Sequence, residues 1–214
     1  MIRTITIPSS ITTVSSVLGL GLSSIQLSAD EECAIHFSSC EFGEPLPMLI
    51  LGREIRNLIR NNRGSKITAY SKPTSFRGYA DHVGFFRYCG FQRGNEPGQA
   101  LGSPNYIPIT FLDIDDLKQA SGDRPYAEIM VEKAAELTKV LMQEDNGPVF
   151  DVISYSIREM LRNAAEHSQS SVVVIFGQFW PQKHRAEIAL FDAGIGIKWP
   201  DLEGWQHNSP SVGL

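Results

Sequence analysis

Two short clusters between residues 159 and 196 have the residue types and spacing that phosphate and metal chemistry needs. In the first, Glu159, Asn163 and His167 are four residues apart, so they fall on one face of a helix, one turn from each other. A carboxylate, an amide and an imidazole in one row offer a base, a neutral oxygen ligand and a titratable donor. Oxygen groups of this kind suit Mg²⁺, which keeps several waters and shares the phosphates of its substrate. The alternative is a solvated polar face, which most amphipathic helices have.

The second cluster is Asp192-Ala-Gly194-Ile-Gly196, which follows an apolar run. Two glycines separated by one residue let the backbone approach a ligand closely, and the aspartate is placed to accept from an exocyclic amine. A glycine-rich turn after a strand is common, so this motif alone is weak. It is neither the phosphate loop, which needs a following G-K-[ST], nor the dinucleotide fingerprint, which needs a third glycine in a βαβ unit.

Hydrophobic periodicity predicts the elements that must position these clusters. Residues 148–167 are predicted to be a helix, because proline is tolerated in a first turn and apolar residues recur at intervals of three and four. Its expected buried face consists of Val152, Ile153, Ile157, Met160, Leu161 and Ala164. Residues 172–176 and 186–191 are predicted to be an antiparallel pair of strands. Residues 125–142 are predicted to be an amphipathic helix that packs on this sheet, with a dimer seam as the alternative.

Taken together and in this order, the clusters resemble the GHKL superfamily, the ATP-binding domains of histidine kinases, DNA gyrase B, Hsp90 and MutL. Residues 159–163, which read E-x-x-x-N, resemble the N box of that family. Residues 163–167, which read N-A-A-E-H, resemble its histidine-kinase and anti-sigma-kinase form. Residues 192–196, which read D-x-G-x-G, resemble its first glycine box. The resemblance also implies that His167 reaches the phosphates.

The resemblance implies a role for each remaining residue of the two motifs. Asn163 is expected to hold the Mg²⁺ that bridges the phosphates of ATP. Glu159 is expected to polarise a water or an acceptor hydroxyl, or to support the metal shell. Asp192 is expected to accept from the adenine amino group, while Gly194 and Gly196 let the chain pass close to the nucleotide.

The sequence departs from that family after Gly196. The family continues with a lid, a second glycine-rich box against the phosphates and a further strand, whereas only Gly204 and Gly213 follow here before Leu214. We therefore expect the chain to be a fragment, with a partner that completes the site as the alternative.

The N-terminal part is predicted to contain a parallel βαβ unit. Its strand, helix and strand are expected over residues 34–37, 48–60 and 67–70. Residues 2–7 alternate and are predicted to be an edge strand. Residues 82–91 are predicted to be one short aromatic helix that ends at its glycine, Gly90.

This order of elements resembles a STAS-like, or anti-anti-sigma-like, domain over residues 1–110. The loop that carries a serine or threonine in phospho-switched members, residues 41–47, reads E-F-G-E-P-L-P, so phosphorylation is not expected there. The predicted fold is thus of mixed α+β and α/β class. The STAS-like β/α domain is followed by a linker over residues 111–124. A partial two-layer α/β sandwich of Bergerat type, the histidine kinase-like ATPase domain, then occupies residues 125–214.

Composition narrows the classes of function. A net charge of −5, with 42% hydrophobic and 20% charged residues, is ordinary for a globular protein and gives no general attraction to nucleic acid. The three cysteines lack metal-ligand spacing and indicate reduced thiols in a cytoplasmic protein. No apolar run approaches ~18 residues, so no membrane span is expected. The acidic stretch 113–116 is interpreted as a solvated turn, and Arg53, Arg56 and Arg60 as a solvated helix face.

Two functions from different classes follow. The first is an ATP-binding regulator of the GHKL type, which uses Mg²⁺ and either hydrolyses ATP or transfers its phosphoryl group to a protein partner, as a histidine or serine kinase does. The alternative is a non-catalytic interaction module, in which a degenerate ATPase fold and the STAS-like domain serve as docking surfaces, or in which nucleotide occupancy only switches a conformation. A nucleotide, a protein partner and a second copy of the chain are the expected partners. A role in signalling is an analogy at the level of the fold.

Overall fold

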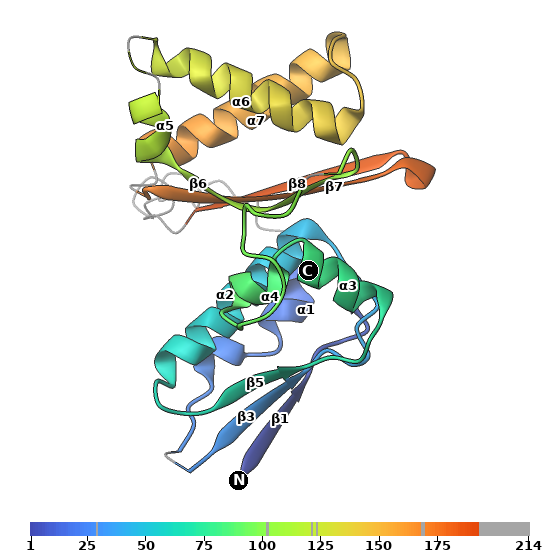
Figure 1. Ribbon diagram of the computed structural model, residues 1–214, viewed down its shortest axis with the longest axis vertical. Coiled ribbons are helices and arrows are strands. Elements are labelled where there is room, and N and C mark those ends of the chain that lie inside the picture. The colour runs from blue at the N-terminus through green and yellow to red at the C-terminus, as the bar shows by residue number, and fades with distance from the viewer. Residues whose placement is uncertain (29, 102, 121, 123, 168–169, 193–214) are drawn as a thin grey trace, which may run out of the picture.

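The computed structural model has four layers along its long axis (Figure 1). A pair of helices lies on an antiparallel sheet, a group of helices lies on the other face of that sheet, and a parallel sheet forms the opposite end. The fold is therefore mixed α and β, as predicted. The structure describes residues 1–28, 30–101, 103–120, 122, 124–167 and 170–192.

The parallel sheet contains β1 (Ile2–Thr6), β3 (Glu32–His36) and β5 (Ile67–Tyr70), in the order β1-β3-β5. The edge position of β1 is confirmed. Helix α2 (Pro45–Asn61) connects β3 to β5, which pair in parallel, so the predicted βαβ unit is confirmed. Proline is tolerated at the start of α2 because the first N–H groups of a helix have no intrahelical partner.

Short elements fill the connections of this unit. Strands β2 (Ser10–Ile11) and β4 (Phe42–Gly43) pair in parallel. Helix α1 (Val14–Leu18) and the 3₁₀ turn η1 (Leu22–Ser24) both pack on α2.

The single aromatic helix predicted before Gly90 is wrong at its start. The structure has two helices, α3 (Ser75–His82) and α4 (Phe85–Cys89). Gly84 separates them with φ 83°, a left-handed conformation that interrupts a right-handed helix and that glycine adopts without strain. Gly90, with φ 101°, ends α4 as predicted.

The antiparallel sheet contains β6 (Tyr106–Asp113), β7 (Val172–Trp180) and β8 (Arg185–Asp192), in the order β6-β7-β8. The predicted pairing of the last two strands is confirmed, with the turn η2 (Pro181–Lys183) between them. Strand β6, more than fifty residues earlier in the chain, adds the third strand.

Helices α6 (Tyr126–Met142) and α7 (Pro148–His167) cover one face of this sheet. The predicted packing of the first of them on the sheet is confirmed. The buried cluster between the helices and the sheet contains Ile107, Leu112, Ile114, Met130, Ala134, Leu137, Leu141, Ile157, Leu161, Ala164, Val173 and Ile175. Two members of the expected buried face of α7 are exposed instead: Val152 by 65% and Met160 by 42%. The apolar residues of α7 extend around more of the helix than the part that the sheet and α6 cover.

The acidic stretch 113–116 is not a turn but the start of helix α5 (Ile114–Ala120). Asp113 accepts from the N–H groups of Asp115 and Asp116, at 2.8 and 3.1 Å. An aspartate in this position satisfies N–H groups that a helix leaves unpaired. The predicted linker 111–124 accordingly contains the end of β6 and the whole of α5.

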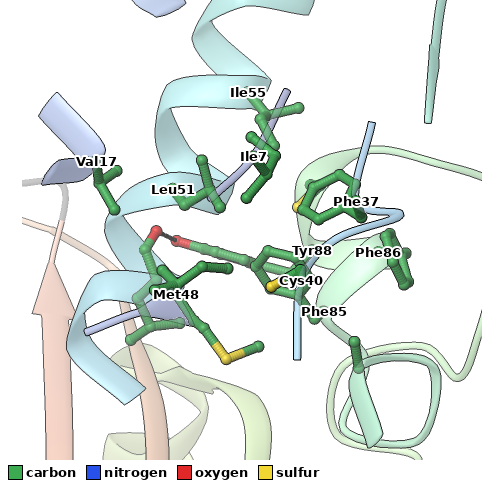
Figure 2. Close-up of a cluster of buried hydrophobic side chains, with 14 of the residues drawn as sticks. Ile7, Val17, Phe37, Cys40, Met48, Leu51, Ile55, Phe85, Phe86 and Tyr88 are labelled. Atoms are coloured by element: carbon green, nitrogen blue, oxygen red, sulfur yellow. Dashed lines mark hydrogen bonds between the residues drawn. The ribbon is translucent and has the colours of Figure 1, made fainter. Parts of the chain in front are cut away.

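The second face of the antiparallel sheet joins the N-terminal core. Ile109, Val174, Phe176 and Ala189 belong to the same buried cluster as α2, α3, α4 and the parallel strands. Figure 2 shows side chains of this cluster converging from α1, α2, α4 and the segments that follow β1 and β3. The antiparallel sheet is therefore covered on both faces, and the two predicted domains share one hydrophobic core. Within the described residues, no helix has the length and apolar character needed to span a bilayer.

Candidate functional site

Helix α7 carries the N-box-like residues on the side away from its core. Ile157 and Leu161 are 1% and 0% exposed and fix that side of the helix against α6 and the sheet. Glu159 and Asn163 follow Ile157 by two and six residues, which places them on the opposite side of the helix. Glu159 and Asn163 thus share the outward face, and Asn163 is exposed. His167 is the last residue of the helix.

Two arginines hold the carboxylate of Glu159. Its Oε1 lies 2.8 Å from Nη2 of Arg158, and its Oε2 lies 2.6 Å from Nη2 of Arg162. The ring of Tyr155 lies under the guanidinium of Arg158, at 4.6 Å from its centroid. Both carboxylate oxygens are engaged, and the two guanidinium groups fix the orientation of Glu159.

Strand β8 ends at Asp192, on the side of the sheet that α7 covers. Successive side chains of a strand point to opposite faces. Ile188 and Leu190 pack against the cluster under α6 and α7, whereas Ala189 belongs to the opposite core. Asp192 therefore takes the same face as Ile188 and Leu190. Because it is the last residue of the strand, it also borders a cavity on the other face.

Chain connectivity brings the outward face of α7 and Asp192 to one end of the molecule. The helix ends at His167, β7 begins at Val172, and Val173 is paired with Asp192. The last turns of α7 and the end of β8 thus lie at the same end of the sheet. Asn163 and Asp192 thus lie at the same end of the molecule, with Asn163 on the outward side of α7 and Asp192 at the end of the sheet beneath the helix.

The two predicted glycines of the motif, Gly194 and Gly196, lie outside the described residues. The expectation that the backbone at these glycines passes close to a nucleotide therefore stays a prediction.

A partly buried tyrosine, Tyr126, lies at the same end of the helical layer. Tyr126 begins α6, and its hydroxyl is buried without a hydrogen-bond partner within the described part of the chain. Burial raises the pKa of Tyr126, and the carboxylates of Glu166 and Asp115 raise it further. The tyrosine is held neutral and keeps a proton that it can donate.

The polar groups at this end of the molecule do not include a metal site made of protein side chains alone, within the described residues. Among the described residues, no group of three or more His, Cys, Asp or Glu side chains is placed to hold a metal. Mg²⁺ usually binds through one or two protein oxygens, with substrate phosphates and waters in its remaining positions. The exposed amide of Asn163 provides one such oxygen.

The sequence interpretation missed the partners of Glu159. Arg162 follows it by three residues, a spacing that places two helical side chains side by side, and this signal was available. Comparison with protein-family models, with curated proteins and with solved structures finds no match to this chain.

Proposed function

We propose that this chain is an ATP-binding regulatory protein of the GHKL type. The observation that carries the proposal is that Asn163 and Asp192 lie at one end of the molecule, in the order helix, strand, strand that the resemblance requires. The exposed amide of Asn163 and the carboxylate of Asp192 supply the polar groups that the resemblance assigns to the nucleotide.

Each residue has a distinct task in this proposal. Asp192 accepts from the adenine amino group and selects the base. Asn163 holds Mg²⁺, which neutralises phosphate charge and positions the γ-phosphate when it is bound. The carboxylate of Glu159 orients a water or an acceptor hydroxyl, which would permit ATP hydrolysis or phosphoryl transfer to a protein partner.

The ion pairs of Glu159 favour the second candidate, a nucleotide-dependent interaction module without turnover. A carboxylate held by Arg158 and Arg162 orders the surface of α7 without acting on a proton. In that case nucleotide binding alone changes how the chain docks on a protein partner or on a second copy.

Calorimetric titration with Mg·ATP and Mg·ADP tests the binding proposal. Asp192→Asn removes a charged hydrogen-bond acceptor, so we expect binding to weaken about ten- to hundredfold. Asn163→Ala is expected to weaken the dependence of binding on Mg²⁺. Asp151→Asn is the matched control, because Asp151 is an exposed carboxylate in the first turn of α7, at the other end of the helix.

Phosphate release by the wild type and by Glu159→Gln then separates the two candidates. If the wild type releases phosphate and Glu159→Gln does not, the chain is an enzyme that uses Glu159. If the wild type binds nucleotide without releasing phosphate, the chain is the interaction module. Absence of binding by this chain and by a chain extended beyond Leu214 would refute the ATP-binding proposal.

A further inference from the structure

A cavity of about 1050 Å³ lies between the C-terminal half of α2 and the antiparallel sheet, on the face away from α6 and α7. Its sheet wall is formed by Phe111, Val172, Val174 and Phe191. Its volume is at the upper end of the range of small-ligand sites, about 300–1,000 Å³. The cavity has room for a ligand as large as a nucleotide.

Four arginines border this cavity: Arg53, Arg56 and Arg60 on α2, and Arg63 in the turn that follows it. The spacing of three and four residues places the first three along one face of the helix. These three cover about 10 Å at the rise of an α-helix, and Arg63 follows just beyond the helix end. A row of this length presents positive charge to several anionic groups of one ligand at once.

Most of this positive charge is not neutralised within the described part of the chain. Arg53 is paired with the carboxylate of Glu54, at 2.9 Å. Arg56, Arg60 and Arg63 are exposed, and within the described residues no carboxylate forms an ion pair with them. The single carboxylate in the described lining of the cavity is that of Asp192, at its edge. In a chain with a net charge of −5, this is a local concentration of positive charge.

An aromatic surface stands beside the arginines. Phe111, on β6, is 43% exposed, although its side chain lies on the same face of the sheet as the buried Ile109. Its ring centroid lies 6.1 Å from that of Tyr88, and the guanidinium of Arg56 lies 5.6 Å above the Tyr88 ring. Exposed aromatic rings next to guanidinium groups are the surfaces on which nucleic acid bases stack.

We propose that this cavity binds a nucleotide ligand that carries two or more phosphates, at a site that borders the ATP site proposed above at Asp192 and needs no Mg²⁺. The phosphates lie along Arg56, Arg60 and Arg63, and the base stacks on Phe111. Guanidinium groups bind phosphate through paired, charge-assisted hydrogen bonds, so this site needs no metal ion. A mononucleotide and a single-stranded oligonucleotide offer the same chemistry.

Fluorescence anisotropy in the presence of EDTA tests the proposal on the whole chain. One arm uses a labelled oligothymidylate of eight nucleotides, and the other uses labelled ATP, so that the arms separate the two sources of phosphate. We expect binding in at least one arm, with an affinity that falls as salt is raised. Arg56→Glu and Arg60→Glu are each expected to weaken it about tenfold or more, because each removes a charged hydrogen-bonding group and adds repulsion.

Arg3→Glu is the matched control. Arg3 is an exposed arginine on β1, at the far edge of the parallel sheet, and its reversal changes the net charge by the same amount. It is expected to leave the affinity within about twofold. The substitution Phe111→Leu retains an apolar side chain but removes the ring, and it is expected to weaken binding while the salt dependence stays unchanged. Circular dichroism melting of each variant shows that the fold is intact.

Absence of binding in both arms would overturn the proposal. Equal losses in Arg3→Glu and Arg56→Glu would also overturn it, because they would show a general effect of charge. Asn163→Ala distinguishes this site from the ATP site, since it is expected to leave binding in EDTA unchanged. Binding in EDTA without any Mg²⁺-dependent nucleotide binding would refute the ATP site and leave this one standing.

Discussion

Helix α2 has a glycine, Gly52, at the point where it crosses the ring of Tyr88. A Cβ atom at this position would lie 2.4 Å from both Cδ1 and Cε1 of that ring. Tyr88 is 3% exposed, and its hydroxyl donates to the carbonyl of Leu49 at 3.2 Å. The substitution Gly52→Ala therefore forces a buried ring, not the flexible end of a side chain, to move.

Three effects determine how much Gly52→Ala lowers the free energy of unfolding. Overpacking of a dense core costs about 1–3 kcal/mol, and loss of the hydrogen bond to Leu49 costs about 1 kcal/mol. The gain in helix propensity from glycine to alanine offsets about 1 kcal/mol. We expect Gly52→Ala to lower the free energy of unfolding by about 2 kcal/mol and Tm by about 4–8 °C.

Urea denaturation, followed by circular dichroism, measures this difference. Gly78→Ala is the control, because Gly78 lies in helix α3 and an added Cβ meets nothing within 4 Å. That variant is expected to be as stable as the wild type or more stable by up to about 1 kcal/mol. If both variants were equally stable, the tight contact between α2 and Tyr88 would not exist in solution, and the argument would be refuted.

Three further predictions concern pH, charge and the shared core. Burial raises the pKa of Cys40 from 9.0 to about 11 and that of Tyr88 from 10.0 to about 12. Because the unfolded chain releases these protons at lower pH than the folded chain, the urea midpoint is expected to fall as pH rises above about 9; a midpoint that stays constant up to pH 11 would contradict this. Glu159→Gln breaks two partly exposed ion pairs, so calorimetry should show that the free energy of unfolding falls by less than about 1 kcal/mol. A larger decrease would show that the pairs hold α7 in place. Phe176→Ala removes a side chain that is 0% exposed, so urea denaturation should show that the free energy of unfolding falls by about 3–5 kcal/mol. Tyr155→Ala removes a side chain that is 58% exposed, and the same measurement should show a decrease of less than about 0.5 kcal/mol.

The regular elements could be predicted because their periodicity is set by the fold itself. In α2, Met48, Leu51, Ile55 and Leu58 recur at helical spacing, and all four are 0% exposed. A strand on each side of such a helix leaves few arrangements other than a parallel unit. The order of a helix followed by two paired strands, over α7, β7 and β8, was likewise predicted from periodicity.

The remaining features depend on contacts that periodicity does not encode. Gly84 interrupts a helix by adopting positive φ, but a glycine in the sequence does not reveal its φ. The apolar residues of α7 occupy more than one face, so the exposure of Val152 follows only from where the sheet and α6 lie. The arginines of α2 looked like a solvated face because the wall opposite them comes from β6, β7 and β8. Phe111 and Val172 are about fifty and one hundred residues further along the chain.

The shared core also has a consequence for folding during synthesis. Helix α2 buries apolar side chains against β7, which leaves the ribosome roughly 110 residues later, or roughly 5–20 s at typical rates of translation. During that interval β1, β3 and β5 are available to pair, while one side of the helices that cover them still faces water. A nascent chain in this state exposes an apolar surface that binds chaperones or other nascent chains. Closure of the antiparallel sheet over α2 is then a late step, and it makes the solubility of the N-terminal half depend on the C-terminal half.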